Sequence, residues 1–213
     1  MSKRIKDTYQ KYLWIFTFIN VLIFWSIFVY GTIDFDEINS NLYKLVSTKS
    51  FIFLLSPIIT LVLNGIIPSS FKEIIVFWKI KGRLPGCRAF SHFAMEDPRV
   101  NIELLKNKVG EFPKEPKEQN RIWYSLYQEY SNDKVILGSH RDFLLMRDIT
   151  SLSFLFLLIL GTLSFLFNNL TYTFAYLCFL IVQFLVSSLV ARNYGNRFVC
   201  NVLAKASQAY SKK

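Results

Sequence analysis

Three long stretches of the chain contain no Asp, Glu, Lys or Arg. Residues 12–33 and 50–71 form two such stretches of 22 residues each, and residues 149–191 form a third of 43 residues. A bilayer core of ~30 Å is crossed by ~20 helical residues at ~1.5 Å each. Each shorter stretch therefore predicts one membrane span. The longest predicts two spans with a tight reversal at Asn168 and Asn169.

The pattern as a whole predicts an all-α integral membrane protein with four transmembrane helices and a small helical cytoplasmic insert between spans 2 and 3. The spans are expected at about residues 12–31, 51–68, 150–167 and 172–190. Tyr and Trp side chains stand near the expected interfaces, where amphipathic rings are favoured. Buried core helices of a soluble protein are the weaker alternative, because such helices rarely run this long without a charge.

Four segments follow from these spans. They are the N-terminal tail with the first hairpin, the insert, the second hairpin and a basic tail, at residues 1–71, 72–148, 149–191 and 192–213. In the insert we expect helices at 98–109 and 117–131, and a third that begins after Asp133 and runs into span 3. The tail is expected to continue span 4. The insert is marginal in size for a core of its own, so other helices, the tail or another protomer should cover its apolar face.

The distribution of basic residues indicates an orientation. Residues 1–11, the insert and the tail carry 23 of the 25 Lys and Arg, whereas the loop 32–49 carries two Lys and three acids. The positive-inside rule places both termini and the insert on the cytoplasmic side of the membrane. The net charge of +10 then reflects orientation and anionic lipid headgroups. Direct nucleic-acid contact is the less favoured explanation, because no stacking motif stands out.

Two sets of cytoplasmic side chains are candidates for binding a partner or a lipid headgroup. Arg83, Arg88 and Arg99 belong to the densest polar region, and their guanidinium groups match phosphate or carboxylate oxygens. The second set consists of Trp123, Tyr127 and Tyr130, which lie on one aromatic face of the helix expected at 117–131. The alternative for the arginines is a solvated loop whose long side chains extend to the interface.

The predicted spans contain no ionisable residue, which weighs against pumps, voltage sensors and ion-coupled transporters. Their polar groups are carboxamides and hydroxyls, with Asn20, Asn64 and Gln183 the most prominent. Such side chains join membrane helices by hydrogen bonds. In the alternative, some of them line a pore formed by several protomers, because a single four-helix bundle is filled by its own side chains.

Catalytic and metal-binding patterns are weak. His92 and His140 are the only histidines, and neither belongs to a recognised ligand spacing. The tripeptide from His140 to Asp142 begins like a kinase catalytic loop, but Arg147 stands where that loop requires Asn. We expect no catalytic residue, no metal site and no cofactor, and therefore not an enzyme.

The compact four-span plan, the insert around RLPGCRAFSHFAMEDPRV and the Phe/Leu/Ile-rich spans together resemble one family. The chain resembles the small multi-pass membrane effectors of bacterial anti-phage systems, such as retron and cyclic-oligonucleotide defence modules. The resemblance is architectural and transfers no residue roles. It implies a membrane toxin that a cytoplasmic sensor protein or ribonucleoprotein complex holds inactive or triggers.

The leading hypothesis is thus an effector that oligomerises in the lipid bilayer and permeabilises or depolarises the inner membrane, as in abortive infection. A non-enzymatic scaffold that anchors a cytoplasmic complex is the first alternative. The second is an interfacial enzyme acting on lipid or phosphate, which would need a histidine paired with Asp97 or Asp142.

Overall fold

The computed structural model describes residues 5–29, 55, 57–167 and 169–209. Within these residues every regular element is a helix and no strand is found. The predicted all-α class is therefore confirmed. The predicted outer loop 32–49, much of the first half of span 2 and the residues at both termini lie outside the described residues.

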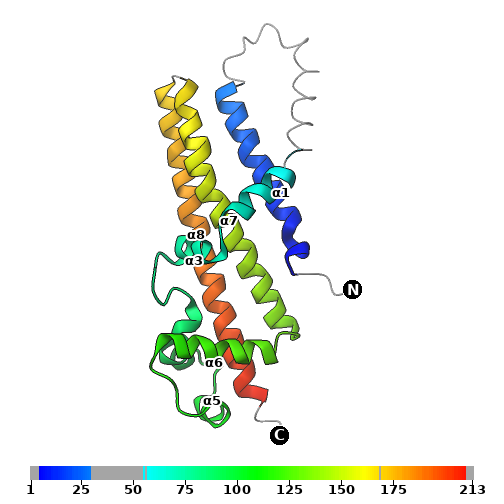
Figure 1. The fold of residues 1–213 in the computed structure, drawn as a ribbon, viewed down its shortest axis with the longest axis vertical. Helices are drawn as coiled ribbons and strands as arrows, with labels where there is room; N and C mark the ends of the chain where they lie inside the picture. The colour runs from blue at the N-terminus through cyan, green and yellow to red at the C-terminus, as the bar shows by residue number, and fades with distance from the viewer. Residues whose placement is uncertain (1–4, 30–54, 56, 168, 210–213) are drawn as a thin grey trace. The chain divides into compact units, whose positions relative to one another are not determined.

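The described helices follow one another along the chain (Figure 1). In order they are α1 (Ile5–Phe24), a π-helix (Trp25–Val29), a helix Pro57–Ile66, α3 (Ser69–Phe77), a 3₁₀ turn (Pro85–Arg88), a π-helix (Ala89–Phe93), α4 (Ala94–Glu96), α5 (Ile102–Val109), α6 (Pro116–Glu129), α7 (Lys134–Ser164), a 3₁₀ turn (Phe165–Phe167) and α8 (Leu170–Ala209).

Three of the described helices are long and apolar enough to cross a membrane: Ile5–Phe28, Lys134–Phe167 and Leu170–Gln208. The helix Pro57–Ile66 and α3 together would make a fourth span, but they are bent by 85° at Pro68. Proline lacks the backbone donor that would continue the helix, which explains why the bend falls there.

Two compact units share these helices. Unit 1 contains residues Met1–Lys72 and Asp148–Ser187, and unit 2 contains Glu73–Arg147 and Ser188–Lys213. The chain passes from one unit to the other within α3, α7 and α8 and not in loops. As predicted, α7 and α8 each continue a charge-free stretch into a charged one without interruption.

Unit 1 is apolar outside and partly polar inside. Large aliphatic and aromatic side chains are exposed on its helices: Ile15, Ile19, Ile58, Leu61, Val62, Leu158, Leu166, Phe174, Val182 and Val186. Its buried positions include Thr17, Asn20, Thr60, Asn64, Ser153, Ser164, Thr173 and Ser187. An exposed apolar surface of this extent is unfavourable in water and favourable in lipid.

The apolar parts of α7 and α8 form a hairpin (Figure 1). Asn169 caps α8, because its side-chain oxygen accepts a hydrogen bond from the backbone N–H of Tyr172 at 3.3 Å. The Thr173 hydroxyl donates to the carbonyl of Ser164 at 3.1 Å and so ties the start of α8 to the end of α7. The predicted reversal therefore lies where the sequence places it, although Asn168 itself is outside the described residues.

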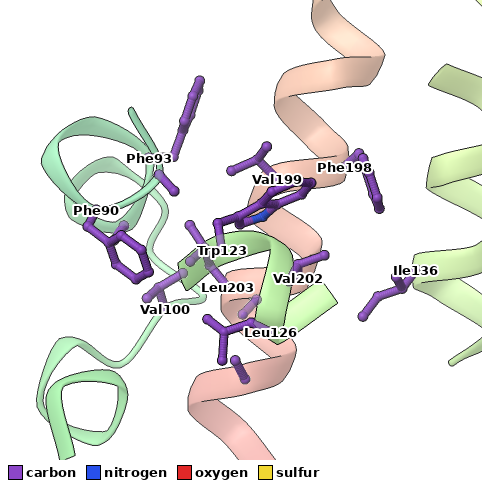
Figure 2. Packing of buried hydrophobic residues seen from close by; sticks show 14 of the residues in the cluster. Phe90, Phe93, Val100, Trp123, Leu126, Ile136, Phe198, Val199, Val202 and Leu203 are labelled. Carbon is purple, nitrogen blue, oxygen red and sulfur yellow. The ribbon is translucent and has the colours of Figure 1, made fainter. Parts of the chain in front are cut away.

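Unit 2 has its own hydrophobic core (Figure 2). Its α6 contributes Trp123 and Leu126, and the C-terminal part of α8 contributes Phe198 and Val202. The rings of Trp123 and Phe198 meet edge to face, with centroids 5.3 Å apart. The apolar face predicted for residues 122–130 is thus covered by the tail of the same chain.

A close approach of backbone to side chain orders the turn region before α4. Gly86 lies so near α6 that a Cβ atom there would come within 2.8 Å of Trp123 Cε3. Gln119, also on α6, is 1% exposed and accepts hydrogen bonds from the backbone N–H groups of Phe90 and Ser91, both at 3.1 Å. The carboxamide thereby satisfies buried donors that the irregular π-helix leaves open.

The sequence predicts a helix over 98–109, but the structure begins α5 at Ile102. Asn101 is the N-cap, and its side-chain oxygen accepts the N–H of Leu104 at 3.1 Å. The Asp97 side chain accepts hydrogen bonds from the backbone N–H and the Nε of Arg99, both at 3.0 Å, and residues 98–99 form a turn that does not continue into α5. The predicted end is confirmed, since Gly110 takes a φ of 81° that favours glycine.

The end of α3 is fixed by a contact with α8 inside unit 2. Trp78 has a φ of 53°, a left-handed conformation that stops the helix. The Arg192 guanidinium lies 3.9 Å from the centre of the Trp78 ring and its Nε donates to the Val76 carbonyl at 2.6 Å. A cation at the C-terminal end of a helix is favourable for the helix dipole.

Replacing Gly86 by Ala should destabilise unit 2 by ~1–3 kcal/mol, because the rigid Trp123 ring has to shift. Thermal unfolding of the full chain in detergent, followed by circular dichroism, measures the loss. Gly138→Ala on α7 is the matched control, since nothing lies within 4 Å of its Cβ position and helix propensity favours Ala by ~1 kcal/mol. Equal melting temperatures for the two variants would contradict the packing argument.

Candidate functional site

A buried ion pair stands out in the interior of unit 1. Lys72 Nζ lies 3.1 Å from Asp148 Oδ1, and the two side chains are only 6% and 2% exposed. Lys72 comes from the first half of α3 and Asp148 from α7. Burying such charges is costly unless each finds partners, so two further polar side chains complete the arrangement.

Tyr9 and Asn64 bind the second carboxylate oxygen. The Tyr9 hydroxyl donates to Asp148 Oδ2 at 3.1 Å, and Asn64 Nδ2 donates to the same oxygen at 3.3 Å. Lys72 also donates to the Asn64 side-chain oxygen. We call Tyr9, Asn64, Lys72 and Asp148 the charged cluster. It joins four helical segments of unit 1: α1, the helix Pro57–Ile66, α3 and α7.

Polar contacts continue from this cluster along α1. The buried residues of α1 are Tyr9, Leu13, Thr17 and Asn20, whose spacing places them on one face. Thr60 donates to Thr17 at 2.7 Å, and Gln183 Nε2 donates to Asn20 Oδ1 at 3.0 Å. From Tyr9 to Asn20 these contacts follow α1 for ~16 Å, about half of the ~30 Å thickness of a bilayer core.

An aromatic cluster follows Asn20 on α1 and its π-helical continuation. Phe24 and Phe28 lie 5.2 Å apart, and each contacts both Phe167 and Tyr176 at centroid distances of 5.4–5.9 Å. Phe28 is 2% exposed. We call these four residues the aromatic plug. A pocket of about 610 Å³ adjoins it, lined by Ile23, Ser26, Ile27, Tyr172, Ala175, Tyr176 and Phe179.

The structure places the three predicted intramembrane residues within unit 1, but not together. Asn20 and Gln183 form one hydrogen bond, whereas Asn64 belongs to the charged cluster. The role of Lys72 and Asp148 was missed because each stands just beyond a charge-free stretch and reads as a solvated flank of the insert. A signal for the polar helix faces is nevertheless present in the sequence. It is the i, i+4 spacing of Thr60 with Asn64 and of Gln183 with Ser187, which places each pair on one face of its helix.

The predicted arginine cluster separates into three local interactions in unit 2. Arg83 Nε lies 2.7 Å from a Glu73 carboxylate oxygen. Arg88 stacks over the Phe93 ring at 5.7 Å. The Arg99 guanidinium binds Asp97 at 2.7 Å and the side-chain oxygen of Asn201 at 2.9 Å. Arg99 lowers the pKa of Asp97, chiefly through this side-chain hydrogen bond.

The three predicted aromatic residues take different places. Trp123 is 8% exposed and belongs to the core, so its ring is not available to a large partner. The Tyr127 hydroxyl forms a hydrogen bond of 3.0 Å with His140 Nδ1. Tyr130 accepts a hydrogen bond from Lys108, whose ammonium lies over the Tyr130 ring at 4.5 Å. Tyr124, which the sequence did not single out, is the half-exposed aromatic residue of this helix.

Neither histidine of unit 2 pairs with the acids that an interfacial enzyme would require. His92 Nδ1 lies 2.9 Å from Glu96, and His140 binds Tyr127. Asp97 binds Arg99, and Asp142 binds Arg141 at 2.9 Å. Among the described residues, no group of three His, Cys, Asp or Glu side chains is placed to hold a metal ion.

Comparisons of the chain with protein-family models, with curated proteins and with solved structures found no match.

The Lys72–Asp148 pair should show strong coupling between its members. Lys72→Met leaves a buried carboxylate without its cation, and Asp148→Asn leaves a buried ammonium, so each should lose ~3–5 kcal/mol of stability. The double variant removes both charges and should lose less than the sum of the single changes. Unfolding of the purified protein in detergent measures all four members of the cycle, and strictly additive losses would contradict the buried pair.

His140 should make unit 2 sensitive to mild acid. Burial, and secondly the charge of Arg147, lower the pKa of His140 from 6.5 to about 4. Between these pH values the unfolded chain takes up a proton that the folded unit does not, so stability falls as the pH decreases from ~6.5 to ~4. The expected loss is on the order of 2 kcal/mol, because the ring keeps some contact with solvent.

His140→Gln should remove this part of the pH dependence, as measured by melting temperatures between pH 7.5 and pH 4. His92→Gln, on the half-exposed second histidine, is the matched control and should retain it. The same slope in both variants would show that His140 is not the responsible group.

Proposed function

We propose that this protein is a four-span inner-membrane effector whose membrane part holds a closed permeation path. The observation that carries the proposal is the interior of unit 1, where a line of polar contacts ends at the aromatic plug. Placing an ion pair in an apolar medium costs free energy, and spans that serve only as an anchor do not require one.

The arrangement corresponds to two parts of a gated path. The charged cluster stands at the cytoplasmic edge of the expected spans, and together with the Thr17–Thr60 and Asn20–Gln183 pairs it supplies groups that can replace water around an ion along ~16 Å of α1. The aromatic plug supplies a dry constriction over the part that follows. Hydrophobic constrictions close pores because water and ions leave them.

Opening requires the helices of unit 1 to separate or rearrange, because their side chains fill the interior. One route is assembly of several protomers, in which the polar faces line a shared path and the apolar faces remain in lipid. The bend at Pro68 and the π-helix Trp25–Val29 are irregular segments where such a rearrangement can begin.

In this proposal both termini and unit 2 lie in the cytoplasm, where the excess of Lys and Arg belongs under the positive-inside rule. A cytoplasmic sensor protein or ribonucleoprotein complex would then release the closed state. Anti-phage defence by abortive infection is the setting we propose, on the architectural resemblance described above.

A non-enzymatic scaffold is the second candidate, and the separate hydrophobic core of unit 2 favours it. A folded cytoplasmic unit can bind a complex without any ion flux. Exchanging the membrane spans for those of an unrelated four-span protein separates the candidates. A scaffold would keep its function after the exchange, and a permeation path would lose it.

Loosening the aromatic plug should open the path without a trigger. We expect Phe28→Ala to lower the membrane potential and slow the growth of cells that express it, because it removes a buried ring that contacts the other three residues of the plug. A membrane-potential dye in intact cells and ion efflux from liposomes holding the purified protein measure the effect. Lys72→Met together with Asp148→Asn in the same background should reduce the flux, because the two changes remove the charges of the path without leaving one of them unpaired.

Phe174→Ala is the matched control, since this ring is 60% exposed on the outer surface of unit 1. It should leave both readouts at the wild-type level. If Phe28→Ala and Phe174→Ala behave alike, the plug is not a gate. If the wild-type chain leaves the potential unchanged with its genomic neighbours and during phage challenge, the effector proposal fails.

A further inference from the structure

Unit 2 contains a pocket of about 280 Å³ that the permeation path does not use. Residues from α6, α7, α8 and the turn before α4 surround it. The lining is Glu73, Leu84, Pro85, Gly86, Asn120, Trp123, Tyr124, Tyr127, His140, Phe143, Leu144, Arg147, Gly195, Phe198 and Val199. Its volume lies just below the ~300 Å³ at which typical small-molecule pockets start, so only a small ligand group would fit.

Aromatic rings make up much of the wall and are held in fixed orientations. His140 and Phe198 stack at 4.9 Å with 9° between their planes, and Tyr127 meets Phe198 edge to face at 5.2 Å. Trp123 stacks with Tyr127 at 6.1 Å. Figure 2 shows Trp123 and Phe198 beside Val199 on the same side of this core. Rigid aromatic faces of this kind favour flat ligands, which gain stacking contacts.

The pocket also offers hydrogen-bonding groups at a few positions. Asn120, the Tyr127 hydroxyl and His140 stand among the apolar residues of the lining. A mostly apolar wall with a small number of polar groups is typical of sites that orient a small molecule. Within the described residues the hydrogen bond of His140 is the one between Nδ1 and the Tyr127 hydroxyl, so the second ring nitrogen remains for a ligand.

The charges around the pocket decide against a cation. Aromatic cages that bind quaternary ammonium groups rely on an attractive negative potential. Here the Glu73 carboxylate is neutralised by Arg83 at 2.7 Å, and Arg147 contributes a positive charge to the lining. The same arginine helps to lower the pKa of His140. The charged side chains of the lining, Glu73 and Arg147, therefore give the pocket no net negative charge.

We propose that this pocket binds a flat heteroaromatic ring of about nucleobase size, carried by a neutral or anionic small molecule. Tyr124, which is 49% exposed, stands at the opening and would cover the bound ring. The site is independent of the permeation path, since all its residues belong to unit 2.

Calorimetric titration of the full chain in detergent tests the proposal. The probes are the four ribonucleoside monophosphates, the four corresponding nucleosides, and choline as a quaternary ammonium of opposite charge. At least one base-containing probe should bind saturably with a dissociation constant below ~1 mM, and choline should not bind. Monophosphates that bind more tightly than their nucleosides would show that the anionic group contributes.

Two variants locate the binding in the pocket. Leu144→Trp fills the cavity and should weaken binding at least ~10-fold, whereas Leu144→Met, which conserves volume, should leave it within ~3-fold. Tyr124→Ala opens the mouth and should also weaken binding, and it remains informative if Leu144→Trp does not fold. Circular dichroism checks the fold of each variant.

The proposal is overturned if no base-containing probe binds, if choline binds as tightly as the best of them, or if folded Leu144→Trp and Tyr124→Ala both bind like the wild type. None of these results would affect the permeation proposal, whose readout is ion flux through unit 1.

Discussion

Taking a charge out of water is tolerable only when its atoms all find partners, and the charged cluster of unit 1 meets that condition. One carboxylate oxygen of Asp148 forms an ion pair with Lys72, and the other accepts hydrogen bonds from Tyr9 and Asn64. Each partner comes from a different helical segment. The cluster therefore specifies how these segments pack, since a helix that turned away would leave an uncompensated charge behind.

The same constraint explains the unusual distribution of polarity in unit 1. Hydrocarbon does not drive apolar surfaces together, so membrane helices associate through close packing and hydrogen bonds. Thr17, Asn20 and Gln183 are buried or half-buried for that reason, while residues such as Leu61 are exposed. Unit 2 follows the opposite rule of water-soluble proteins, with Trp123, Leu126 and Phe198 buried together.

We propose that these two regimes divide the roles of the protein. Unit 1 combines a polar interior with an aromatic plug, which is the physical requirement for a path that is closed at rest. Unit 2 combines a folded core with a pocket of fixed aromatic rings, which is the requirement for recognising a small molecule. The chain passes between the units three times, within α3, α7 and α8.

Much of this was determined by local sequence. Charge-free stretches predicted the long apolar helices, and Asn169 and Gly110 marked helix ends. The i, i+4 pattern of α6 marked its apolar face. These signals could be read from the sequence because they depend only on neighbouring residues along the chain. The predicted start of α5 was wrong, because residues 98–99 form a turn and Asn101 is the residue that caps the helix. The pairing of Lys72 with Asp148, the cover of Trp123 by Phe198 and the pocket around His140 join residues that are dozens of positions apart. Hydropathy records whether a residue prefers water, but not which residue it meets, and that choice belongs to the tertiary structure.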